Sequence, residues 1–175
     1  MSHQAALIAV VGGECSGKTS LCEALGQALP AINVPEYLRS WCERESRPPG
    51  REEQRTIILG QLRAERAARM QARSQGVHWV VSDGGALLTA AYSLEYFGDR
   101  SLLATGLRRA RAARMVLLTS PEIDWRADGL LRDGPQRRRA VHERLVSLLA
   151  QAGIAYHLIA GNPDERLRAA LSKLR

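Results

Sequence analysis

The feature that most constrains this chain is the run Gly12-Gly13-Glu14-Cys15-Ser16-Gly17-Lys18-Thr19. It matches the pattern G-x-x-x-x-G-K-[ST], in which glycines let successive backbone N–H groups turn toward phosphate oxygens. An apolar, strand-like run over residues 6–11 precedes it, and a helical pattern over residues 19–29 follows. The sequence therefore predicts a phosphate-binding loop at the start of a helix, where the helix dipole favours anions.

Short apolar runs alternate with helical patterns along the rest of the chain. After residues 6–11, we expect strands over residues 32–34, 77–82, 115–119 and 154–159. Helices are expected over residues 19–29, 51–75, 86–97, 101–113, 135–152 and from Asn162 onward. Five apolar strands separated by helices indicate a parallel sheet covered on both faces. We therefore expect a three-layer α/β protein forming a single domain over residues 1–175.

The loop and the end of another strand predict a site for ATP and Mg²⁺. Lys18 is expected to reach the β- and γ-phosphates and to act in catalysis, and Thr19 to ligate Mg²⁺. Asp83 directly follows the run 77–82 and is expected to be a second Mg²⁺ ligand; the alternative is an Asp that forms a turn before Gly84-Gly85. No Glu follows Asp83, which weakens a hydrolytic interpretation. Nucleotide contacts are assigned to Gly12, Gly13, Glu14, Cys15, Ser16, Gly17, Lys18, Thr19 and Ser20.

Phosphoryl transfer to a hydroxyl needs a group that accepts its proton and positive charge over the γ-phosphate. Glu36 follows the second strand and is predicted to be the general base or a ligand of the substrate hydroxyl; the alternative is an exposed residue in a first helical turn. Arg39 lies one turn further and is predicted to contact phosphate, or else to be a solvated arginine.

Residues 44–50 and 121–134 look like surface excursions after strands, where open α/β sheets build their sites. An Arg-rich lid is expected around residues 121–139, with Arg126 and Arg132 clamping the transferred phosphoryl group. Of the three arginines at 137–139, at most two can contact the phosphoryl group, since the side chains of neighbouring residues on a helix point in different directions.

Aromatic side chains near the site would stack on a nucleobase or a cationic pyridinium ring, or else pack in the core. Substrate contacts are predicted for Glu36, Tyr37, Asp83, Tyr92 and Trp125.

The net charge of +7 points first toward a polyanion. Only Lys18 and Lys173 are lysines, so 23 of the 25 basic residues are arginines, which a general composition bias also explains. The scarcity of aromatic residues argues against single-stranded nucleic acid as a partner.

Three cysteines without a C-x-x-C pair predict neither disulfides nor zinc. No apolar run approaches a membrane span of ~20 residues and no signal peptide is evident, so we expect a cytoplasmic location and no membrane partner. The oligomeric state stays open.

Several motifs occur in the order found in one family. They are the loop GGECSGKT, the segment Pro35-Glu36-Tyr37-Leu38-Arg39, Ser82-Asp83 followed by Thr89 and Tyr92-Ser93, and Asp124-Trp125 followed by Asp128-Gly129 and Arg132. The chain resembles the ribosylnicotinamide kinase domain of the bifunctional NAD-biosynthesis regulator and its stand-alone P-loop ATP-binding relatives. The resemblance covers nearly the whole chain, and the PEY-x-R and D-W-x-x-D-G motifs are its specific part.

This resemblance implies a P-loop kinase fold with strand order 2-3-1-4-5. It also implies ATP-dependent phosphorylation of the ribose 5′-hydroxyl of nicotinamide riboside, with adenine bound near residues 161–163. Kinase members of the family commonly carry a second Asp two places after the first, where this chain has Gly85.

Three functions are compatible with these residues. The first is an ATP- and Mg²⁺-dependent kinase that acts on a small, nucleoside-like molecule. The second is a nucleotide-binding regulatory NTPase without a small-molecule acceptor, although the chain has no guanine-reading N-K-x-D sequence. The third is a nucleic-acid-linked ATPase, which the positive charge favours and the short, aromatic-poor chain does not.

Overall fold

A computed structural model describes residues 5–123 and 134–174. Its five strands form one parallel sheet in the order β2-β3-β1-β4-β5. The strands are β1 (Ala6–Val11), β2 (Ala31–Val34), β3 (Trp79–Asp83), β4 (Met115–Thr119) and β5 (His157–Ile159). The predicted fold class and strand order are therefore confirmed.

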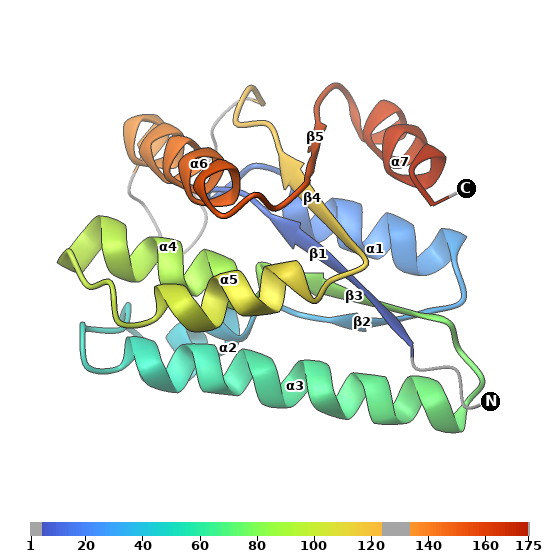
Figure 1. Cartoon of the computed structure of the whole chain (residues 1–175), viewed down its shortest axis with the longest axis horizontal. Coiled ribbons are helices and arrows are strands. Elements are labelled where there is room, and N and C mark those ends of the chain that lie inside the picture. The colour runs from blue at the N-terminus through green and yellow to red at the C-terminus, as the bar shows by residue number, and fades with distance from the viewer. Residues whose placement is uncertain (1–4, 124–133, 175) are drawn as a thin grey trace.

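Helices cover both faces of this sheet (Figure 1). They are α1 (Lys18–Ala28), α2 (Tyr37–Glu45), α3 (Gln54–Ser74), α4 (Gly85–Phe97), α5 (Leu103–Arg111), α6 (Gly134–Gln151) and α7 (Pro163–Ser172). In the part of the chain that the structure describes, no helix has both the length and the apolar character needed to cross a membrane.

Strand side chains alternate between the two faces, as expected for buried strands. Ile8 and Val10 of β1 pack with residues of α1 and α7 on one face. Val11 faces the other way and joins the larger cluster built by α2 to α6, and Leu7 packs with residues of α3. The core thus lies in two layers, and the carboxyl ends of the strands are left to form the site.

Helix α2 is the element that the sequence patterns did not indicate. Its composition is polar, but Leu38, Trp41 and Cys42 lie at i, i+3 and i+4 and are all buried. That spacing is the signal for a short amphipathic helix. The last strand is also shorter than expected, because residues 154–156 are not part of β5 and Ile154 instead packs in the α2–α6 core.

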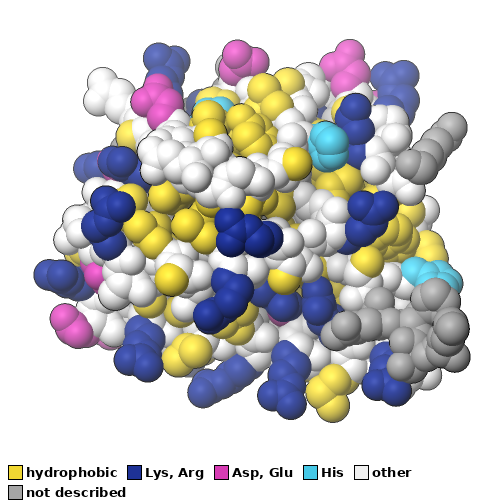
Figure 2. Space-filling view, viewed as in Figure 1, with side chains coloured by type: hydrophobic (Ala, Val, Ile, Leu, Met, Phe, Trp, Pro, Cys, Tyr) yellow, Lys and Arg dark blue, Asp and Glu magenta, His cyan; other side chains and the backbone are white. Residues whose placement is uncertain are grey.

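Most arginines lie on solvent-exposed helix faces (Figure 2). Exposed examples on α3 and α5 are Arg55, Arg63, Arg66, Arg73, Arg108 and Arg111. Among residues 5–123 and 134–174, Arg138 and Arg166 are buried. Most of the positive charge in the described part of the chain therefore lies on the surface, and Arg138 and Arg166 lie against the phosphate-binding loop.

Candidate active site

The strand register brings the predicted site residues to one edge of the sheet. Val10 of β1 lies beside Asp83 of β3, and Val34 of β2 lies beside Ser82. Because both pairs are parallel, Glu36 falls level with Gly84, and the loop that begins at Gly12 starts beside Asp83. The site is thus built from three adjacent strand ends, from the edge strand β2 through β3 to the central strand β1.

The loop between β1 and α1 is folded tightly against the end of β4. The Ser16 hydroxyl donates to the Gly13 carbonyl at 2.7 Å and also lies 2.7 Å from the Thr119 hydroxyl. A Cβ at Gly12 would overlap both of these side chains, so only glycine allows this approach. Lys18 is buried, and its Nζ donates to the Gly13 carbonyl at 3.0 Å, which holds the ammonium against the loop.

Thr19 and Asp83 present oxygen ligands at the mouth of this loop. The Thr19 hydroxyl donates to Asp83 Oδ2 at 2.6 Å. Asp83 is 3% exposed, and its Oδ1 has no hydrogen-bond partner among residues 5–123 and 134–174. A buried carboxylate oxygen without a partner is costly unless it binds a proton donor or a cation. Oxygen donors of this kind suit Mg²⁺, which is held by one or two carboxylates plus substrate phosphates.

Glu36 lies directly against the Asp83–Gly84 turn. A Cβ built on Gly84 would sit 3.2 Å from Cγ and 3.3 Å from Cδ of Glu36. Burial raises the pKa of the Cys22 thiol in α1, and the charge of Asp83 raises it further while Lys18 lowers it and Glu36 raises it. The charges of Lys18, Glu36 and Asp83 therefore all act on the Cys22 thiol.

Two arginines that were not among the predicted catalytic residues support the loop. Arg138 of α6 donates from Nη1 to the Cys15 carbonyl at 3.1 Å. Arg166 of α7 donates from Nη1 to the Ser16 carbonyl at 2.7 Å and from Nε to the Gly161 carbonyl at 2.8 Å. Burial lowers the pKa of Arg166. Arg138 lies within the predicted arginine-rich helix start, but nothing in the sequence separates Arg166 from the many surface arginines.

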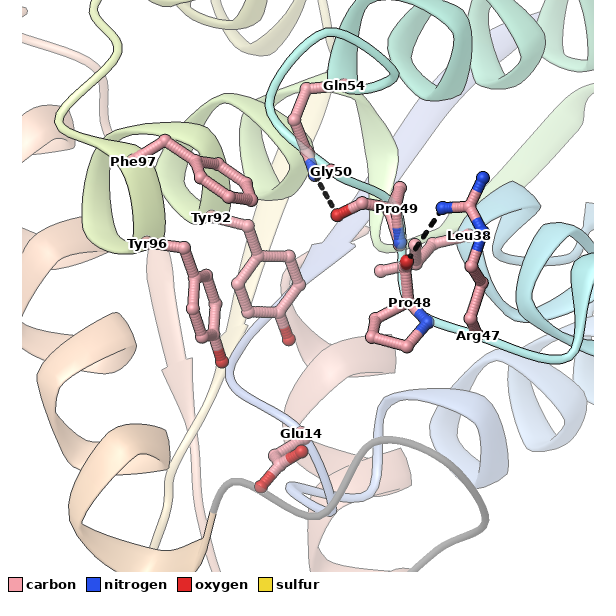
Figure 3. A pocket seen from close by; sticks show the side chains of 10 residues that line it. All are labelled: Glu14, Leu38, Arg47, Pro48, Pro49, Gly50, Gln54, Tyr92, Tyr96 and Phe97. Atoms are coloured by element: carbon pink, nitrogen blue, oxygen red, sulfur yellow. Dashed lines mark hydrogen bonds between the residues drawn. The ribbon is translucent and has the colours of Figure 1, made fainter.

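A cavity of about 450 Å³ opens beside the loop (Figure 3). Figure 3 shows the aromatic rings of α4 on one side, the segment after α2 on the other, and Glu14 of the loop at one end. The lining residues are Glu14, Leu38, Arg47, Pro48, Pro49, Gly50, Gln54, Tyr92, Tyr96 and Phe97. Of the predicted substrate and nucleotide residues, Glu14 and Tyr92 line this cavity. The chemical character of the wall is mainly aromatic and apolar, with charged groups at its edges.

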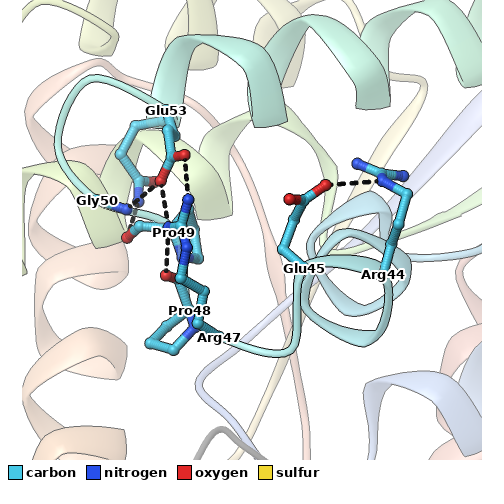
Figure 4. Close-up of polar contacts among 8 residues, drawn as sticks. Arg44, Glu45, Arg47, Pro48, Pro49, Gly50 and Glu53 are labelled. Carbon is cyan, nitrogen blue, oxygen red and sulfur yellow. Dashed lines mark hydrogen bonds and ion pairs between the residues drawn. The ribbon is translucent and has the colours of Figure 1, made fainter.

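The segment between α2 and α3, which lines one side of this cavity, is held by hydrogen bonds to Glu53 (Figure 4). Arg47 makes two hydrogen bonds to the Glu53 carboxylate, at 2.6 and 2.7 Å, and its guanidinium lies 5.0 Å from the centroid of the Trp41 ring. The Arg47 contact and the Gly50 N–H lower the pKa of Glu53 to about 2. Glu53 therefore keeps its charge, and with it the pairing, down to about that pH.

Other predicted residues lie elsewhere. The Tyr37 ring packs against Gly60 of α3, which leaves no room for a Cβ there, and Tyr37 does not line the cavity. Arg39 is exposed on α2, and Ser20 is exposed on α1. Trp125, Arg126 and Arg132 lie outside the described residues, as does most of the expected lid.

Gly85 stands at the position where the resemblance led us to expect a second Asp. A Cβ at Gly85 would sit 3.8 Å from Glu65 Oε1 and 4.0 Å from Ser82 Oγ. Glu65 is fully buried and paired with Arg109, whose Nε lies 2.6 Å from Oε2. An Asp at position 85 would bring a second carboxylate to this buried pair, which is unfavourable without a second cation. The positive φ of +61° at this position also favours glycine.

We expect Gly84→Ala to destabilise the fold more than Gly98→Ala does. Both glycines flank α4 at positive φ, +78° and +63°, so each substitution carries backbone strain of about 1–3 kcal/mol. Position 98 has open space around its Cβ, whereas position 84 also meets Glu36 and Leu88. Urea unfolding of the two variants measures the difference, to which the backbone also contributes, because Gly98 (ψ 12°) lies in the left-handed helical region and Gly84 (ψ −53°) lies outside it. Equal losses of stability would contradict the close contact of Glu36 with Gly84.

A parallel sheet in this order, opening from its central strand into a glycine-rich anion loop, is the architecture of P-loop kinases. A family model described as an AAA domain matches residues 7–166, and the chain belongs to this family. No curated protein matches the sequence.

Solved structures agree on the fold. A structure described as NadR protein in complex with NR matches with a TM-score of 0.79 at 22% identity, over 99% of this chain and 51% of that one. The chain thus spans about half the length of NadR. A thymidylate kinase from Candida albicans matches with a TM-score of 0.71 at 12% identity, over 98% and 91% of the two chains. A deoxyadenosine kinase from M. mycoides with bound dATP matches with a TM-score of 0.65 at 13% identity, over 97% and 98%. The resemblance stated from the motifs thus extends to the fold.

Proposed function

We propose that this chain is an ATP- and Mg²⁺-dependent kinase that phosphorylates a hydroxyl of a small, nucleoside-like acceptor. The observation that carries the proposal is the 450 Å³ cavity, which is lined by aromatic rings of α4 and reaches Glu14 of the phosphate-binding loop. A pure nucleotide switch has no need for a second, aromatic cavity that meets the loop. An acceptor bound there would have its ring among apolar side chains and its hydroxyl toward the phosphates.

The proposed step transfers the γ-phosphoryl group from ATP to the acceptor oxygen. The bond from the γ-phosphorus to the bridging oxygen breaks, a bond to the acceptor oxygen forms, and ADP leaves. Glu36 accepts the hydroxyl proton. Lys18 offsets negative charge on the β- and γ-phosphates, and Arg39, Arg126 and Arg132 are proposed to add positive charge. Thr19 and Asp83 would hold Mg²⁺, whose charge stabilises the phosphates.

For the acceptor itself we propose nicotinamide riboside, phosphorylated at its ribose 5′-hydroxyl. The support is the ordered set of motifs, the structural similarity to NadR in complex with NR, and the rings of Tyr92 and Tyr96 at the cavity. A cationic pyridinium ring gains attraction from such aromatic faces, of about 0.5–2 kcal/mol. The departure at Gly85 leaves Asp83 as the acidic residue at this strand end.

A panel of acceptors tests the proposal. The purified protein is supplied with ATP and Mg²⁺ and, in separate reactions, with nicotinamide riboside, thymidine, deoxyadenosine or no acceptor, and ADP release is measured. We expect ADP release to depend on nicotinamide riboside. Release that depends on another nucleoside would support a kinase and overturn the nicotinamide assignment. Release that is the same with and without every acceptor would favour the regulatory NTPase and contradict the kinase.

A further inference from the structure

A buried glutamine on α3 connects the two strand ends that carry Glu36 and Asp83. The Gln61 side chain is 2% exposed, and its Oε1 accepts from the Tyr37 N–H at 2.8 Å. Its Nε2 donates to Ser82 Oγ at 3.0 Å and to the Asp83 carbonyl at 3.3 Å. One amide group therefore bridges the residue after Glu36 to Asp83 itself.

The orientation of this amide is fixed by its partners. A backbone N–H can only donate and a backbone carbonyl can only accept, so Oε1 must face Tyr37 and Nε2 must face Asp83. The Ser82 hydroxyl donates onward to Glu65 Oε1 at 2.8 Å, which turns its lone pairs toward Gln61. Glu65 is held in turn by Arg109. The series of hydrogen bonds from Arg109 through Glu65, Ser82 and Gln61 to Tyr37 therefore has one consistent direction of donors and acceptors.

The bond from Tyr37 to Gln61 also satisfies the start of helix α2. Glu36 is the N-cap residue of α2, a position whose side chain usually accepts a hydrogen bond from the first turn. Within the described residues 5–123, the Glu36 side chain makes no such capping bond. The Tyr37 N–H, one of the donors that a helix start leaves unsatisfied, is taken by Gln61 instead. The Glu36 side chain lies against Gly84, the residue that follows Asp83.

We infer that Gln61 is a positioning residue that sets the distance and direction between the Glu36 carboxylate and Asp83. The inference rests on the proposed function, because that function gives these two groups their roles in proton transfer and Mg²⁺ binding. Glutamine is suited to the position because it has both an acceptor and a donor on one short, planar group. Methionine has a similar length and neither group, and glutamate keeps the acceptor and loses the donor.

Two variants test the inference in the full chain, with Gln71→Met on the exposed face of the same helix as control. In Gln61→Met, the Tyr37 amide should exchange with solvent about tenfold faster by NMR, because its hydrogen bond is lost. In Gln61→Glu, the carboxylate still accepts from Tyr37, so this amide should stay slow. Both variants should lower kcat by up to about 10²-fold, because a small displacement of reacting groups has effects of this size. The KM for ATP should stay close to wild type in both.

The outcomes separate the inference from the proposed function. Unchanged Tyr37 exchange in Gln61→Met, or an unchanged kcat in both variants, would overturn the positioning role. A parallel loss of kcat and ATP affinity that follows the melting temperature would show a purely structural role, and would overturn it too. If one variant does not fold, the other decides. A wild-type protein without acceptor-dependent transfer would contradict the proposed function alone, because the amide measurement needs no turnover.

Discussion

Replacing Lys18 by methionine should slow phosphoryl transfer by about 10²- to 10³-fold, the range seen when one preorganised donor to a developing negative charge is removed. Lys18 is buried and its ammonium lies 3.0 Å from the Gly13 carbonyl, so it is held at the loop before nucleotide binds. Methionine keeps the length of the side chain and removes the charge. The rate at saturating ATP and acceptor is the measurement.

The second lysine of the chain supplies the control. Lys173 is exposed at the end of α7, far along the sequence from the loop, and Lys173→Met makes the same chemical change there. We expect it to leave the rate unchanged. Urea unfolding shows whether Lys18→Met keeps the fold. A folded Lys18→Met protein that retains most of the wild-type rate would contradict the role given to this residue.

Glu36→Gln should lower turnover by about 10²-fold or more, because an amide cannot accept the proton of the acceptor hydroxyl. The substitution keeps the shape of the side chain against Gly84, so the fold and ATP binding should be preserved. Glu43→Gln, on an exposed part of α2, is the matched control and should have no effect. Steady-state rates for the three proteins make the comparison. A near-wild-type rate for Glu36→Gln would show that Glu36 is not the general base.

The sheet and the position of the site could be predicted from the sequence because both depend on local patterns. The apolar runs have the length of buried strands, and a glycine-rich loop between a strand and a helix has few other interpretations. Residues that follow parallel strands meet at one edge, which is why the sequence predicts Glu36 and Asp83 at the same edge of the sheet. The strand register then aligns the two strand ends, because Val34 of β2 lies beside Ser82 of β3.

The supports of the site could not be predicted in this way. Gln61 lies on a helix with a mostly polar surface, and its partners Tyr37 and Asp83 are 24 and 22 residues away in sequence. Arg166 contacts a loop residue 150 positions earlier. No local pattern distinguishes such residues from solvated ones, because their roles arise only from tertiary packing. The aromatic side of the cavity was partly visible, since Tyr92 was predicted as a substrate contact while Phe97 was not.

The arginine excess also has a clearer meaning in the folded chain. Arg138 and Arg166 are buried and donate to carbonyls of the phosphate-binding loop. Others join surface pairs such as Arg137 and Arg144 with Glu95, where ion pairs contribute little to stability. The positive charge is therefore mostly a property of the surface, and a small buried subset holds the loop in shape.

The central claim is that the γ-phosphoryl group of ATP passes to an acceptor held in the cavity rather than to water. The most direct measurement follows this group, by mixing the protein with Mg²⁺, nicotinamide riboside and ATP labelled in the γ-phosphate, and by separating the labelled products. The proposed function predicts label in the 5′-phosphorylated riboside, with formation slowed in Glu36→Gln. Label that appears only as inorganic phosphate, at the same rate with and without the riboside, would contradict it.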